Sequence, residues 1–193
     1  PEAMTHLRQG LAMLSTIAET PERARLELTF QRTLGPVVVA TQGYASPETK
    51  QIYYRSRELC QLVGKTEDIC PVLFGVFLFE TGRAHHQRAI DVAEEILKHA
   101  PHVPGSGGHV AGQVALAVGL VHIGRQSRAR QELEQIIALY DPQRHQPLAF
   151  RYGLEFGITA NAFCAWNWWL LGYPDQALEY GRRTMVLLDK IKH

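Results

Sequence analysis

Histidine is the residue type that most invites a search for chemistry, because nine histidines occur among 193 residues. Five of them lie close together in the sequence: His85, His86, His99, His102 and His109. Two metal ligands on one helical face lie three or four residues apart. Among these five only His99 and His102 have that spacing, and Pro101 interrupts a helix between them. With no HExxH motif present, the pattern favours surface histidines at helix ends and predicts no metal site.

A glycine-rich segment, Pro104 to His109 (PGSGGH), precedes a predicted helix. A helix N-terminus can bind phosphate, but a nucleotide P-loop needs GxxxxGK[ST] after a buried strand. No strand is predicted here and no Lys-Ser/Thr pair follows, so we expect a flexible connector. The sequence also lacks a GxSxG elbow and a pair of acids in apolar surroundings. We therefore expect no catalytic residue and no cofactor.

Cysteine usage and charge limit the compartment and the partners. Cys60, Cys70 and Cys164 form no CxxC pair and lie in apolar helical contexts, as expected of buried free thiols in a reducing cytoplasm. The 20 Lys and Arg residues are interleaved with 19 Asp and Glu residues, which disfavours nucleic acid as a partner. The longest apolar stretch, Pro71 to Phe79, is far shorter than the ~20 residues that span a bilayer. We expect a cytoplasmic chain with no membrane partner.

Helix signals are frequent and strand signals are nearly absent. Helix starts are predicted at Thr20-Pro21, Ser46-Pro47, Thr66 and Tyr173-Pro174, where a capping residue or a proline is followed by an acid. Residues 89–97 and 129–140 have apolar side chains at helical spacing, as in a helix with one buried stripe. Residues 73–79, 114–123 and 162–171 are apolar nearly all round, as in helices enclosed by neighbours.

One helix-turn-helix phrase occurs three times. A small residue comes seven places before a turn, and an alanine follows the turn: Gly75, Gly82 and Ala89; Ala117, Gly124 and Ala129; Ala165, Gly172 and Ala177. Such recurrence is typical of stacked helical pairs that bury each other's apolar faces. In the first copy the alanine comes seven positions after the turn glycine, whereas in the other two it comes five positions after it. We predict an all-α, right-handed α-solenoid of degenerate TPR-like helical hairpins over residues 1–193.

The apolar residues on the first helices of these pairs predict a groove on the inner surface. If they line a concave face, Phe79, Val118, His122, Trp166 and Trp169 are among the residues that would contact a peptide or a helix. Aromatic and aliphatic residues at helical spacing more often belong to a core than to a groove, and we expect Trp168 to point into the core between repeats. The lysine, arginine and asparagine residues that clamp a C-terminal carboxylate in some tetratricopeptide domains are lacking.

Five phrases together resemble one known family. They are LGPVVVATQGYASPE (Leu34 to Glu48), RSRELCQLVG (Arg55 to Gly64), YDPQRH (Tyr140 to His145), LAFRYG (Leu148 to Gly153) and LGYPDQAL (Leu171 to Leu178). The chain resembles the C-terminal tetratricopeptide-like region of large bacterial signalling proteins. In these, a class III adenylate/guanylate cyclase or a Ser/Thr kinase domain is joined to a STAND-type AAA ATPase. Where the family often has an Asp-Pro-Gly step, this chain has Glu155, Phe156 and Gly157.

The resemblance implies a piece of a longer protein that senses or regulates and does no chemistry itself. We expect a noncatalytic module that binds a protein, a peptide or another domain of the same polypeptide on its inner helices. Two alternatives remain open. The chain is a structural or oligomerising scaffold whose apolar surface is filled by its own segments or by a second copy. Otherwise it is a small-molecule sensor with a closed pocket near Trp166 and His122.

Overall fold

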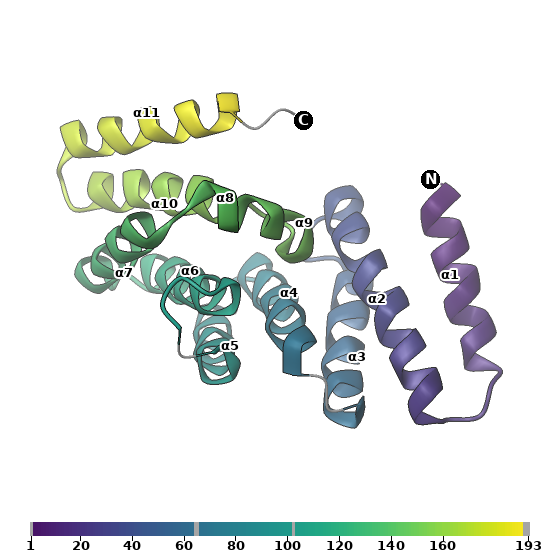
Figure 1. Cartoon of the computed structure of the whole chain (residues 1–193). Coiled ribbons are helices and arrows are strands. Elements are labelled where there is room, and N and C mark those ends of the chain that lie inside the picture. The colour runs from purple at the N-terminus through teal and green to yellow at the C-terminus, as the bar shows by residue number, and fades with distance from the viewer. Residues whose placement is uncertain (1, 64–65, 102, 191–193) are drawn as a thin grey trace.

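The computed structural model describes residues 2–63, 66–101 and 103–190. All regular elements within these ranges are helices, which confirms the all-α prediction. Figure 1 shows the long helices arranged side by side in chain order, from α1 (Glu2–Ser15) at one end to α11 (Pro174–Lys190) at the other. Within the same ranges, no helix combines the length and the apolar character that a membrane span requires.

The N-terminal part consists of α1 (Glu2–Ser15), α2 (Pro21–Gln42) and α3 (Pro47–Val63). Two predicted helix starts are confirmed in detail. The Thr20 side chain accepts a hydrogen bond from the amide of Arg23, and the Ser46 hydroxyl accepts one from the amide of Thr49 at 3.1 Å. Each cap satisfies an amide that the helix itself leaves free.

Three helical pairs follow. The first is α4 (Ile69–Gly82) with α5 (His86–His99), preceded by the short η1 (Thr66–Asp68). The second is α6 (Gly107–His122) with α7 (Gln126–Leu139), and the third is α10 (Phe156–Leu170) with α11 (Pro174–Lys190). Each helix packs against the next one of these pairs, and α6 also packs against α4 and α10. The first helices therefore form a continuous inner layer.

The three turns inside these pairs have one backbone geometry. Ala84, Gly124 and Gly172 are left-handed, with φ of 57°, 77° and 87°. In each turn the left-handed residue donates its amide to the carbonyl three residues earlier, and the next residue donates to the carbonyl five residues earlier. This double closure ends the first helix and directs the chain into the second.

The shared geometry corrects the repeat alignment. The sequence comparison matched Gly82 with Gly124 and Gly172, but the structure places Ala84 there. Ala84 then precedes Ala89 by the same interval as in the other pairs, and Phe77, not Gly75, corresponds to Ala117 and Ala165. The prediction was wrong because glycine was taken to mark the left-handed position. Alanine occupies that position in the first pair, at a higher conformational cost.

Between α7 and α10 the chain crosses the inner layer. This crossing segment, residues 140–155, contains α8 (Pro142–His145), η2 (Gln146–Leu148) and α9 (Ala149–Tyr152). In Figure 1 it runs from the end of α7 past α10 towards α2, and α9 contacts both α2 and α4. The short helices α8 and α9 were not predicted from the sequence.

Several contacts anchor the crossing segment. The ring of Tyr152 lies 5.5 Å from the ring of Phe74 in α4, and the ring of Phe156, the first residue of α10, lies 5.8 Å from the same ring. The imidazole of His145 is 1% exposed and bridges two backbone groups: Nδ1 accepts from the amide of Asp141, and Nε2 lies 2.9 Å from the carbonyl oxygen of Gly105. His145 therefore departs from the expectation of surface histidines. The crossing segment covers part of the inner layer that the sequence analysis expected to be open.

Candidate interaction site

The five residues predicted to line the groove lie at different depths. Phe79 and Val118 are 6% and 4% exposed, so they are buried and do not face a partner. His122 is half-buried, whereas Trp166 and Trp169 are 46% and 64% exposed. The expectation of one groove exposing all five residues is therefore wrong. Only the part on α10 is open.

The corrected repeat alignment explains the burial of Phe79. Counted from the left-handed residue of each turn, Phe79 corresponds to Gly119 and Asn167, which are buried as well. Val118 corresponds to Trp166, but α6 has neighbours on four sides, namely α4, α5, α7 and α10. The same repeat position is thus covered in α6 and open in α10.

Four rings gather where α5, α6 and α10 meet. The imidazoles of His86 and His122 stack with centroids 4.7 Å apart, and the ring of Trp166 meets that of His122 edge-on at 5.5 Å. The ring of Phe163 lies 5.9 Å from His122 and 5.6 Å from Trp166. This aromatic cluster brings together two of the predicted residues, His122 and Trp166. Its other members, His86 and Phe163, were missed because their contacts cross between repeats.

The two histidines of the aromatic cluster have different polar surroundings. Nδ1 of His122 lies 2.7 Å from the carbonyl oxygen of Val118, to which it donates. Nδ1 of His86 is buried and has no hydrogen-bond partner among the described residues. Burial lowers the pKa of His86, and the nearby His122 and His85 lower it further. The neutral form of His86 is therefore favoured in this stack.

In the first pair, one side of α5 receives the next inner helix. A Cβ at Gly119 of α6 would lie 2.6 Å from Cγ1 of Ile90, and one at Gly112 would lie 2.7 Å from Cδ2 of Leu97. Ile90 and Leu97 of α5 are therefore in close contact with α6. His122 has the same role at the end of α6, because its ring contacts Phe163 and Trp166 of α10.

The last pair presents the same side to solvent. Leu178 and Met185 correspond to Ile90 and Leu97, and Leu170 corresponds to His122. These three side chains are 54%, 59% and 48% exposed. We call these three side chains, together with the exposed Trp166 and Trp169 of α10, the helix-accepting face, because the counterparts of Leu170, Leu178 and Met185 in earlier pairs contact the next inner helix. The repeat geometry therefore predicts that the occupant of this face is a helix.

Trp168 is turned away from the helix-accepting face, as the sequence predicted. It is partly buried against the hydrophobic core, and the guanidinium carbon of Arg130 lies 5.0 Å from its ring centroid. The ring of Tyr173 meets it edge-on at 5.2 Å. Trp168 therefore supports the α7–α10 contact and leaves Trp166 and Trp169 as the exposed aromatic pair.

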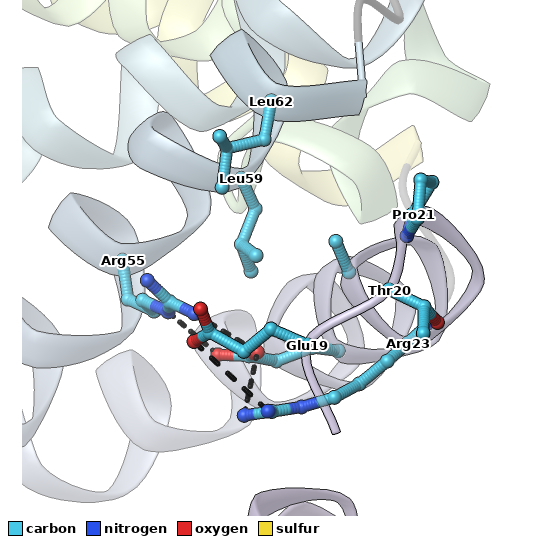
Figure 2. A pocket seen from close by; sticks show the side chains of 9 residues that line it. Glu19, Thr20, Pro21, Arg23, Arg55, Leu59 and Leu62 are labelled. Carbon is cyan, nitrogen blue, oxygen red and sulfur yellow. Dashed lines mark hydrogen bonds and ion pairs between the residues drawn. The ribbon is translucent and has the colours of Figure 1, made fainter. Parts of the chain in front are cut away.

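A second candidate site is the cavity of about 230 Å³ at the start of α2. Figure 2 shows that its charged side chains point toward one another. The guanidinium of Arg55 binds both carboxylate oxygens of Glu27, at 2.7 and 3.1 Å, and Arg23 pairs with Glu19 and Glu27. Because these charges compensate each other, we interpret the network as a link between α2 and α3.

The glycine-rich segment that the sequence analysis considered for phosphate binding supports the start of α6. The Ser106 side chain caps α6, and Gly107 and Gly108 allow Leu148 and Cys70 to approach the helix start. His102 lies outside the described residues, so the His99–His102 pair is not placed. Among the described residues, no group of three or more His, Cys, Asp and Glu side chains gathers as metal ligands would.

Comparison with known proteins gives one weak match. No protein-family model matches the chain, and no solved structure matches it. A protein of Rhizobium meliloti (strain 1021), described as uncharacterized, is 23% identical over 199 residues. The match covers 100% of this chain but 19% of that protein, so the chain spans about a fifth of its relative's length.

Proposed function

We propose that the chain is a noncatalytic interaction and regulatory module, built as a right-handed α-solenoid of degenerate tetratricopeptide-like hairpins. Its helix-accepting face binds an amphipathic helix from another domain of the same polypeptide. One observation supports this most directly. Leu170, Leu178 and Met185 are exposed at repeat positions where His122, Ile90 and Leu97 contact the next helix.

The energetics of the helix-accepting face suit docking of a helix. Full burial of one leucine or methionine side chain stabilises a complex by about 1.5–3 kcal/mol. Tryptophans in the centre of an interface are the residues that most often dominate binding. The face has both, with Trp166 and Trp169 beside three aliphatic side chains. An amphipathic helix with apolar residues at i, i+3, i+4 and i+7 would match it.

The length of the relative supports a partner within the same polypeptide. The match accounts for 19% of the Rhizobium protein, which leaves most of that protein for other domains. We further propose that the parent is a signalling protein of the kind the sequence phrases resemble, with a cyclase or kinase domain and a STAND-type ATPase. The module would shift such a parent between two states only by binding one state more tightly than the other.

Site-specific photo-crosslinking tests the proposal. A benzophenone side chain replaces Trp169 in the protein expressed in its native cells, and the same side chain replaces Phe150 as a control. Phe150 is 90% exposed on the crossing segment, where it lines a different hollow together with residues of α2 and α4. We expect a discrete crosslink at position 169, mapped by mass spectrometry to an amphipathic helix of the same polypeptide and weakened by Trp166→Ala. Equal crosslinking at both positions would contradict the proposal.

The same experiment separates the alternatives. A crosslink between residue 169 and another copy of this chain, with a dimer in light scattering, would favour the oligomerising scaffold. The small-molecule sensor predicts a cavity beside His122 and Trp166. In the described part of the chain, four cavities of about 230 to 490 Å³ are lined by other residues, which does not favour this alternative. Thermal stabilisation by a metabolite panel, lost in Trp166→Ala, would restore it.

A further inference from the structure

A cavity of about 390 Å³ lies where the turn before α3, the first half of α3 and the α4–α5 turn meet. Its wall includes Pro47, Lys50, Tyr54, Arg83, His85 and Arg88. The helix-accepting face belongs to α10 and α11, so this cavity is a separate feature. Its size is within the ~300–1,000 Å³ range of small-molecule sites.

The carboxylate in this wall is bound by the protein itself. Glu80 is 2% exposed, and one of its oxygens accepts a hydrogen bond from the Tyr54 hydroxyl. The other oxygen lies 2.7 Å from Nδ1 of His85. Burial, with the bond to Glu80, raises the pKa of Tyr54 to about 12, so its hydroxyl keeps its proton at neutral pH. Both carboxylate oxygens of Glu80 therefore already have a partner within the protein.

The cations in the wall are free to bind a ligand. Lys50, Arg83 and Arg88 are exposed, and none of them has an ion-pair partner in the described part of the chain. Nζ of Lys50 lies 5.8 Å from the ring centroid of Tyr54. The wall contains three cations, not counting His85, and one carboxylate, that of Glu80. It therefore has an excess of two positive charges, although the whole chain is nearly neutral. The excess positive charge comes from three different elements.

We propose that this cavity binds a small organic phosphate monoester. A phosphate monoester has a charge of about −1.5 to −2 at neutral pH and three strong acceptor oxygens. Guanidinium groups bind such oxygens in a bidentate manner, and a lysine adds a point charge. Pro47, Ala45 and the Tyr54 ring provide an apolar wall for the organic part. A ligand with a carboxylate in place of the phosphate has one charge and two oxygens, so part of the cationic wall would stay unpaired.

Isothermal titration calorimetry with the whole chain tests this inference, with phenyl phosphate as the probe. Inorganic phosphate and benzoate are the comparison ligands. The test variant is the double substitution Arg83→Gln/Arg88→Gln. The matched control is Arg125→Gln/Arg128→Gln, which removes two exposed arginines from the corresponding turn of the next pair, outside the cavity wall. Circular dichroism establishes that both variants are folded.

We expect the wild-type chain to bind phenyl phosphate at least ~10-fold more tightly than inorganic phosphate or benzoate. Each arginine that binds a charged oxygen contributes about tenfold in affinity, so the test variant should lose about 100-fold and the control nothing measurable. Equal losses in both double variants would indicate nonspecific attraction and overturn the proposal. No binding by the wild-type chain, or equal binding of benzoate, would overturn it as well.

Discussion

The burial of Tyr152 against α4 leads to a sharp stability prediction. Tyr152 and Phe150 belong to the same short helix, α9, but Tyr152 is 7% exposed and Phe150 is 90% exposed. If the crossing segment is part of the core, Tyr152→Ala destabilises the fold strongly and Phe150→Ala does not. The pair thus compares two aromatic truncations in one helix.

The expected magnitude follows from the contacts. The Tyr152 ring lies 5.5 Å from the Phe74 ring and 5.2 Å from the Phe156 ring, so its removal leaves a cavity beside both. Truncation of a buried aromatic side chain costs about 3–5 kcal/mol, whereas most exposed substitutions stay within about 0.5 kcal/mol. At about 2–4 °C per kcal/mol for a chain of this size, Tyr152→Ala should lower Tm by about 6–20 °C.

Urea unfolding and thermal unfolding, both followed by circular dichroism, provide the measurement. Tyr152→Phe is the conservative control, because it keeps the ring and removes only the hydroxyl, and we expect it to stay near the wild type. If Tyr152→Ala and Phe150→Ala differ by less than about 0.5 kcal/mol in the free energy of unfolding, the crossing segment is not fixed on the inner layer. The burial argument would then be refuted.

Two further predictions concern other packing contacts. Gly75→Ala should lower the free energy of unfolding by about 1–3 kcal/mol, because the new Cβ overlaps the Tyr53 ring. Gly181→Ala has no atom within 4 Å of the new Cβ and should stabilise helix α11 by about 0.5–1 kcal/mol. Urea unfolding of both variants measures the two effects, and similar effects would contradict the prediction. The lowered pKa of His86 means that unfolded chains bind a proton there more readily than folded ones, so stability falls as pH drops below about 6.5. His86→Gln should therefore show a smaller Tm decrease between pH 7.5 and 5.5 than the wild type, and an equal decrease would rule out this role.

Local sequence signals predicted the helices well. The caps at Thr20 and Ser46 and the proline at the start of α11 define helix ends through contacts between residues close in sequence. The all-round apolar composition of α4 and α6 also predicted that they lie between neighbours. The turn alignment failed in the first pair, because the left-handed position there is taken by Ala84, which has no sequence signal of its own.

The candidate site was predicted only in part, because exposure depends on what covers a helix. Val118 and Trp166 occupy the same repeat position, yet one is buried and the other exposed. The sequence predicted a common inner surface for both. It contained no signal that residues 140–155 would cross this layer, or that His86 would stack on His122.

By itself the sequence determined where several helices begin, that helices form pairs and which faces are apolar, because these properties depend on residues within a few positions of one another. Only the tertiary structure decided which apolar faces are used up in the core. Ile90 and Leu97 contact the next helix, whereas Leu178 and Met185 remain in solvent. The physical reason is that burial is a property of the neighbours of a side chain, and those neighbours come from distant parts of the chain.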